Sequence, residues 1–91
     1  MEFWIIWTET AEEHIARHGV RREDVHCVLE ATFYFRTTRR AAIVIGRCRG
    51  RTIFVALTPS EAVPGAYEVV TARDANRWEE RLYLRRGKGR A

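Results

Sequence analysis

The chain has 91 residues, 46% of them hydrophobic, with three Trp, three Tyr and four Phe. This length allows one domain with a modest core, and the apolar content excludes an intrinsically disordered protein. No apolar run is long enough to span a membrane and the N-terminus lacks a signal-peptide pattern, so we expect a cytoplasmic protein without a membrane partner.

Charge is distributed unevenly along the chain, whose formal net charge is +4. Residues 1–35 carry three Arg against seven acids, a net charge of −4. Residues 36–91 carry thirteen Lys or Arg against five acids, a net charge of +8. A basic region of this kind attracts polyanions, so nucleic acid is the expected class of partner.

The N-terminal third predicts a short strand or packed anchor over residues 3–7, followed by two helices. Thr10 and Glu13 match a capping box, which predicts a first helix over residues 10–18. Gly19 then ends this helix in a left-handed conformation, as in a Schellman turn. Spacing places four residues on its inward stripe: Ala11, His14, Ile15 and His18. A second helix is expected over residues 22–31, with three buried residues: Val25, Val28 and Leu29.

The middle of the chain reads as strands. Residues 33–36 form a short β-type run, and residues 41–48 and 52–58 form two longer runs. The Arg49-Gly50-Arg51 link between the longer runs predicts a hairpin. A further strand is expected over residues 67–72.

The last predicted element is a helix over residues 75–85. Asn76 and Glu79 form a second capping box, and Ala75, Trp78 and Leu82 are expected to face the core. Residues 1–86 are thus one domain, and residues 87–91 are expected to be a basic flexible tail.

These elements predict an α+β fold with two N-terminal helices, a small antiparallel sheet of about four strands and one C-terminal helix. The helices are expected to pack on one side of the sheet, which leaves the other face available. Arginines of the strands and flanking turns, Arg40 among them, are expected to line or rim this face. Those expected to bind RNA phosphates are Arg36, Arg39, Arg47, Arg51 and Arg73.

Metal and thiol chemistry find little support in the pattern. Cys27 and Cys48 lack C-x-x-C spacing and are expected to be free thiols. His14 and His18 share a helix face but lack the glutamate of a metalloprotease motif, so no metal or other cofactor is expected.

The most informative segment runs from Val69 to Glu79, where a strand delivers Arg73 to the start of a helix. A helix N-terminus already favours anions, so Arg73 there predicts a phosphate site. The alternative is that Arg73 forms an ion pair with a carboxylate.

Several side chains together suit metal-free RNA cleavage, in which the 2′-hydroxyl attacks the adjacent phosphate. His18, Glu79 and Tyr83 can exchange protons, while Arg47 and Arg73 can stabilise the charge on phosphorus. Each also has a structural alternative: His18 caps a helix, Glu79 only closes the capping box, and Tyr83 packs against neighbours.

Three groups of residues carry a resemblance to a known family. They are His18-Gly19-Val20 after a short helix, Gly46 in the first hairpin strand, and Val70-Thr71-Ala72-Arg73 followed by Glu79, Arg81, Leu82 and Tyr83. In these features the chain resembles the BrnT family of small toxins, whose fold is similar to that of the RelE ribonuclease toxins. Thr8, Glu12, Glu13 and Asp74 depart from the family pattern.

The resemblance implies an RNA-cleaving toxin of a type II toxin–antitoxin system. His18, Arg73, Glu79 and Tyr83 then match the family's catalytic positions. The implied partner is a ribbon-helix-helix antitoxin, with DNA contacted only through that antitoxin. Two alternatives remain: a non-catalytic member of the fold that binds RNA or protein through its basic face, and an interaction module with Trp4 and Trp7 as an exposed patch.

Overall fold

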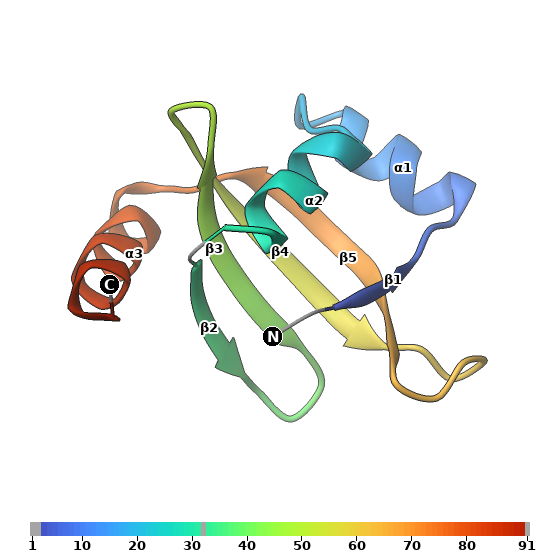
Figure 1. Cartoon of the computed structure of the whole chain (residues 1–91). Helices are drawn as coiled ribbons and strands as arrows, with labels where there is room; N and C mark the ends of the chain where they lie inside the picture. Colours follow the sequence, from blue (N-terminus) through green and yellow to red (C-terminus); the bar gives the residue numbers. More distant parts are fainter. Residues whose placement is uncertain (1–2, 32, 91) are drawn as a thin grey trace.

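A computed structural model describes residues 3–31 and 33–90, with side chains as far as Arg85. The elements follow one another as β1 (Trp4–Ile6), α1 (Glu9–Ala16), α2 (Arg22–Leu29), β2 (Phe33–Thr37), β3 (Ala42–Cys48), β4 (Arg51–Pro59), β5 (Ala66–Asp74) and α3 (Arg77–Arg90). The strands form one sheet in the order β1-β5-β4-β3-β2 (Figure 1). The expected α+β class is therefore confirmed.

The sheet has five strands and is mixed, which corrects the expected antiparallel sheet of about four strands. Strands β2 to β5 form an antiparallel meander, and β1 pairs in parallel with β5, where Ile5 lies opposite Tyr67. The three-residue β1 has its partner near the other end of the chain, so no local pattern reveals the pairing. The fold therefore begins with a strand, ahead of both N-terminal helices.

The predicted hairpin between β3 and β4 is confirmed. Arg49 and Gly50 have φ angles of 54° and 80°, so both central residues of the turn are left-handed. Such a two-residue turn matches the twist of the strands that it joins. It places Cys48 opposite Arg51 and Arg47 opposite Thr52.

Alternation along β3 decides which side chains face α1 and α2. Cys48 is bonded to Cys27 of α2, and Gly46 lies against Val28, so the even-numbered positions of β3 face these helices. The main core lies between this face and the two helices, and its fully buried members include Ile15, Val25, Val44, Val55 and Leu57.

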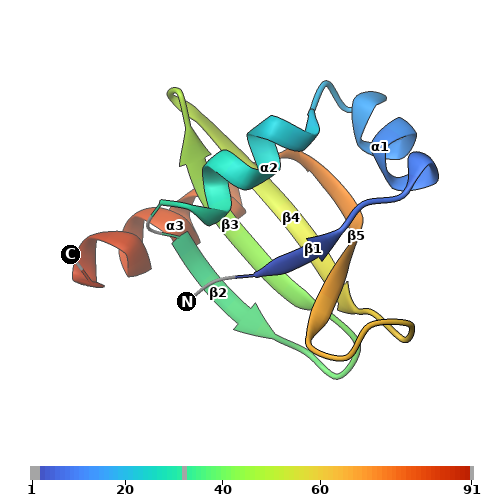
Figure 2. The ribbon, with the colours of Figure 1, turned by 45° about the vertical axis from the view of Figure 1, so that its right-hand side comes forward.

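Helix α3 lies on the opposite face, behind the sheet in Figure 2, where it packs against β2 and β3. Tyr34 and its cross-strand neighbour Ile45 are buried there, apart from the main core. This corrects the expectation that all helices share one face. Trp78, expected in the core, is 62% exposed, because α3 meets the sheet mainly through polar side chains.

The first helix begins at a different cap from the expected one. The Thr8 side chain, not that of Thr10, accepts a hydrogen bond from the backbone of Ala11. The Schellman turn at the other end is confirmed, since Gly19 has a φ of 73° and the Val20 N–H donates to the carbonyl of Ile15.

The two cysteines form a disulfide, which corrects the expectation of free thiols. Cys27 lies in α2 and Cys48 in β3, with their Cα atoms 5.7 Å apart. They are 21 residues apart in sequence, and packing of α2 across the sheet brings them together. No spacing motif signals such a contact.

In the described part of the chain, no helix is both long enough and apolar enough to cross a membrane. Helix α3 runs as far as Arg90 and so includes four residues of the expected basic tail, while Ala91 lies outside the described residues.

Candidate functional site

Arg73 lies near the end of β5, opposite Phe54 of β4, and its guanidinium carbon stands 4.2 Å from the centre of the Phe54 ring. Its two terminal nitrogens donate to the two carboxylate oxygens of Glu79, over 2.8 and 2.9 Å. The ion pair foreseen as the alternative for Arg73 is therefore formed. Even so, 35% of the Arg73 side chain remains exposed, so an anion can approach it.

Glu79 also completes the predicted capping box of α3. Its carboxylate accepts a hydrogen bond from the Asn76 backbone, and the Asn76 side chain accepts one from the Glu79 backbone, both over 2.9 Å. The cap therefore fixes the carboxylate that in turn fixes the guanidinium of Arg73. Sequence reasoning gave the capping box as the alternative role of Glu79 and an unspecified carboxylate as the alternative partner of Arg73, and Glu79 supplies both.

The Arg73–Glu79 pair shifts the ionisation of both groups. Partial burial by itself raises the pKa of Glu79, but hydrogen bonds from Arg73 and Asn76 and the charge of Arg73 outweigh burial, so the pKa lies below its usual value. The hydrogen bond to Glu79 raises the pKa of Arg73, against the effect of burial. Glu79 is therefore a carboxylate at neutral pH and a weak base.

A second polar cluster lies beside the first on the same face of the sheet. The Arg47 Nε donates to the Thr52 hydroxyl over 3.1 Å, and this hydroxyl donates to Glu80 over 3.0 Å. Arg47 also approaches Glu80 to 3.8 Å, and its guanidinium carbon stands 5.9 Å from the centre of the Tyr83 ring. The structure thus brings Arg47 and Tyr83 together, as the cleavage hypothesis requires.

His18 lies beyond the end of α1, in the turn closed by Gly19, and its side chain is exposed. Its ring stands edge-on to that of His14, with 5.4 Å between ring centres. His14 in turn lies 3.1 Å from the hydroxyl of Thr71. Thr71 precedes Arg73 by two residues in β5, so their side chains share a face about 7 Å apart.

The predicted site residues therefore lie around the last residues of β5 and the first turns of α3. Arg73 pairs with Glu79, and Arg47 lies beside Tyr83. The ring of His18 contacts that of His14, which in turn contacts Thr71 of β5. An anion near Arg73 would have to compete with Glu79, because the guanidinium already holds a full set of carboxylate contacts.

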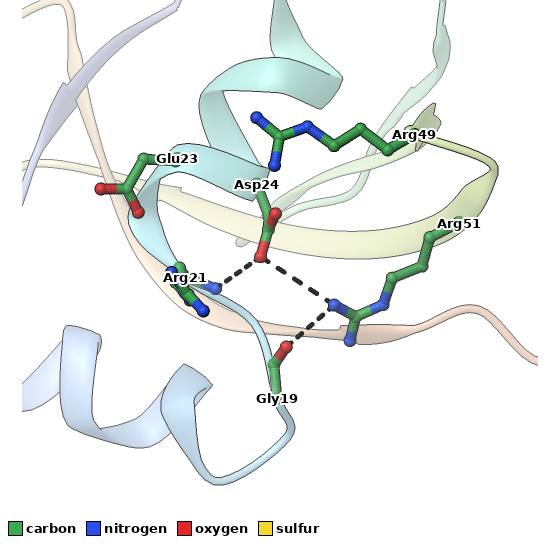
Figure 3. A pocket seen from close by; sticks show the side chains of 6 residues that line it. All are labelled: Gly19, Arg21, Glu23, Asp24, Arg49 and Arg51. Atoms are coloured by element: carbon green, nitrogen blue, oxygen red, sulfur yellow. Dashed lines mark hydrogen bonds and ion pairs between the residues drawn. The ribbon is translucent and has the colours of Figure 1, made fainter.

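Arg51, predicted to bind phosphate, lies instead in a polar cleft of about 420 Å³ on the α2 side of the sheet (Figure 3). Its guanidinium donates to the carbonyls of His18 and Gly19 and pairs with Asp24 and Asp74. These contacts connect the α1–α2 link, α2 and the end of β5. Arg51 therefore has a structural role in this cleft, and its contact with phosphate stays a prediction.

Two further predicted arginines lie apart from the cluster. Arg36 is exposed near the end of β2, opposite Ile43, which is four residues along β3 from Arg47. Arg39 is exposed in the link from β2 to β3 and lines a small pocket with Pro59 and Tyr67. Neither arginine contacts Arg73 or Arg47 in the described structure.

Sequence reasoning missed Thr52 and Glu80 in the Arg47 cluster, and it missed Thr71 as the partner of His14. The Thr52–Arg47 contact had a usable signal, because a two-residue turn at Arg49 and Gly50 dictates that pairing. The contact of Thr71 with His14 had none, since 57 residues separate them. His14 is a partly buried histidine whose ring has a polar partner in Thr71.

Within residues 3–31 and 33–90, no group of three or more His, Cys, Asp or Glu side chains is placed to hold a metal ion. The polar side chains gathered in the described site are arginines, carboxylates, a tyrosine and a histidine pair.

A scan of the sequence against protein-family models finds no match, and a comparison with curated proteins finds none either. Among solved structures, the chain is similar to the crystal structure of the ribonuclease toxin BrnT of Brucella abortus. The TM-score is 0.61 and the sequence identity 26%, over 82% of this chain and 99% of the Brucella chain. The resemblance indicated by the sequence is thereby confirmed, and the chain is BrnT-like, with the fold of a ribonuclease toxin.

Proposed function

We propose that this protein is a toxin that cleaves RNA without a metal ion, by attack of a 2′-hydroxyl on the adjacent phosphate. The observation that carries the proposal is that the sheet face under α3 holds Arg73, paired with Glu79, and Arg47, which lies beside Tyr83, while a histidine pair contacts the strand that bears Arg73. Likeness to a ribonuclease toxin along nearly the whole Brucella chain supports it.

In the proposed reaction, the 2′-oxygen bonds to phosphorus while its proton passes to His18. The bond from phosphorus to the 5′-oxygen then breaks, and Tyr83 gives that oxygen a proton. The products are a 2′,3′-cyclic phosphate and a free 5′-hydroxyl. Arg73 and Arg47 stabilise the extra negative charge on the phosphorane, which is the largest demand of the reaction.

Glu79 has a positioning role in this scheme. It holds Arg73 through two hydrogen bonds, and its lowered pKa leaves it without a proton to donate near neutral pH. When RNA binds, a phosphate takes over part of the arginine contacts. Proton transfer is therefore assigned to His18 and Tyr83.

The proposal includes an antitoxin as partner, of the ribbon-helix-helix type, with DNA reached only through that partner. The support is the family resemblance together with the excess of basic residues after residue 35. A partner that covers the arginines at the start of α3 would block RNA from the same place.

The test is incubation of the purified protein with single-stranded RNA in excess chelator, beside His18→Ala and Arg73→Ala. Loss of His18 is expected to slow cleavage about 10²- to 10⁴-fold. Loss of Arg73 is expected to slow it about 10²- to 10³-fold. Arg22→Ala is the matched control. Arg22 also pairs with a glutamate, but it lies in α2 and its partner Glu12 lies in α1. RNA left equally intact by all four proteins would remove the proposal.

A second candidate function is RNA binding without cleavage. The observation in its favour is that Arg73 and Arg47 are already paired with Glu79 and Glu80. This candidate predicts RNA retention that weakens steeply as salt rises, with no cyclic phosphate among the products.

A further inference from the structure

Helix α3 presents two chemically different sides. Its first turns meet the sheet through three residues: Glu79 pairs with Arg73, Glu80 accepts from Thr52, and Tyr83 lies beside Arg47. At about 100° per residue, Glu79, Tyr83 and Glu80 fall within one arc of about 100° around the helix axis.

The opposite arc, called here the outer face of α3, consists of Arg77, Trp78, Arg81 and Arg85. These four residues also span about 100°, and they are centred opposite the sheet-facing arc. All four are exposed, and Trp78 has 62% of its surface in solvent. A tryptophan this bare on a helix that already has a packed side is not explained by the fold.

Charge on α3 is segregated between the two sides. Both acids of the first turn are directed to the sheet, where they contact Arg73, Thr52 and Arg47. In the described part of the chain, none of the three arginines on the outer face forms an ion pair. The outer face therefore combines uncompensated positive charge with an open aromatic ring.

We propose that the outer face of α3 is a binding surface for single-stranded RNA, with Trp78 stacking on a base and the arginines contacting phosphates. Aromatic rings beside cations are the usual means of binding single strands, since every base has a face that can stack. A base inside a duplex is already stacked, so the surface selects unpaired RNA.

The position of Trp78 connects this surface to the candidate cleavage site. Trp78 directly precedes Glu79, whose carboxylate holds Arg73. An RNA strand that crosses the start of α3 can thus place one base on Trp78 and a neighbouring phosphate near Arg73. The inference rests on the proposed use of RNA as substrate and adds how a single strand is held.

The experiment measures equilibrium binding of a fluorescent single-stranded RNA whose riboses are 2′-O-methylated, so that it cannot be cleaved. Trp78→Ala is expected to weaken binding about 10-fold, and Trp78→Phe, which keeps a ring, much less. Arg81→Ala is expected to lower the salt slope of log affinity by about 0.7. Trp4→Ala is the matched control: Trp4 is 61% exposed but lies in β1, and its loss is expected to leave affinity unchanged.

An oligomer of the same length without bases separates stacking from charge. If Trp78 stacks on bases, wild type and Trp78→Ala bind this oligomer equally. Removal of the bases then lowers the affinity of the wild type more than that of Trp78→Ala. Equal affinity of wild type and Trp78→Ala for the complete RNA would overturn the inference but leave cleavage untouched. No binding by wild type at all would overturn the inference and the proposed function together.

An acidic protein partner is the other occupant that such a surface could take. In that case Trp78→Ala weakens binding of an acidic polypeptide while RNA affinity stays at the wild-type value, and the RNA inference is rejected. Near-ultraviolet and far-ultraviolet circular dichroism of each variant verifies the fold. The fold of the Trp78 variants is expected to be intact because Trp78 contributes little buried surface.

Discussion

At the start of α3, the carboxylate of Glu79 binds both the backbone of the helix cap and the charged side chain of Arg73. Glu79 accepts hydrogen bonds from both terminal nitrogens of Arg73 and from the backbone of Asn76. Removing its charge therefore does two things at once: it loosens the first turn of α3 and it frees a guanidinium for an anion. Stability and RNA affinity should respond to this change in opposite directions.

The first prediction concerns pH. The pKa of Glu79 in the folded protein lies below its ordinary value of 4.5, so the folded state keeps this charge to lower pH than the unfolded chain does. The stability that it contributes is complete above about pH 4.5 and is lost as pH falls through the folded-state pKa. Glu79→Gln should thus lower the free energy of unfolding at neutral pH, and the deficit should shrink on acidification.

Denaturant unfolding of both proteins over a series of pH values measures this deficit. Glu61→Gln is the control, because Glu61 is exposed in the β4–β5 loop and forms no ion pair in the described structure. A deficit that stays constant with pH would mean that the charge of Glu79 has no part in stability.

Helix α2 packs closely against β3 at Gly46. A Cβ atom there would lie 2.8 Å from Cγ1 of Val28 and 3.2 Å from Cβ of Phe33. Both neighbours are held in or against the main core, so neither can move freely. Gly46 is thus required by contact between elements, although its own backbone conformation is one that any residue can adopt.

The second prediction follows from this contact. Gly46→Ala should destabilise the fold by about 1–3 kcal/mol, because the added methyl group forces α2 away from the sheet. Denaturant unfolding measures the change, and a double-mutant cycle with Val28→Ala tests its cause. The smaller side chain at position 28 should remove part of the cost of Gly46→Ala, whereas strictly additive costs would show that the Val28 contact is not responsible.

For the molecule as a whole, α1 and α2 rest on one face of the sheet and α3 on the other, so the two faces are stabilised differently. The α2 face has the aliphatic core and the disulfide, while the α3 face depends on two glutamates, two arginines and a threonine beside a small buried patch. Salt and pH should therefore act mainly on the α3 face, and reducing agents on the α2 face.

The third prediction tests the disulfide. Closing a loop between two cysteines with a sequence separation of 21 stabilises a chain by about 3 kcal/mol in the loop-entropy description. A reducing agent should thus lower the melting temperature of the wild-type protein but leave a Cys27→Ser, Cys48→Ser variant unchanged. Two thiols that titrate in the native, unreduced protein would contradict the bond.

Much of the fold could be predicted from local patterns. The hairpin at Arg49 and Gly50, the Schellman turn at Gly19 and the capping box at Asn76 and Glu79 are each decided by neighbouring residues, and each is present as expected. The cap of α1 differs from the expected one because Thr8 and Thr10 offer equivalent hydroxyls. The helix begins at Glu9, so Thr8, which directly precedes it, makes the bond.

The candidate site was predictable only as a set of residue types. The sequence singled out Arg47, Arg73, Glu79, Tyr83 and His18, but the pairing of each arginine with its glutamate depends on which face of the sheet α3 covers. The catalytic assignment of these residues stays a prediction until cleavage is measured.

By itself, the sequence determined the element types, the turns at Gly19 and Gly50 and the cap of α3, because those depend on backbone preferences and on side chains a few residues apart. Only the tertiary structure decided the parallel pairing of β1 with β5, the Cys27–Cys48 bond and the exposure of Trp78. These three features join or separate segments that are distant along the chain. Each of them depends on how whole elements pack against one another, which no local pattern records.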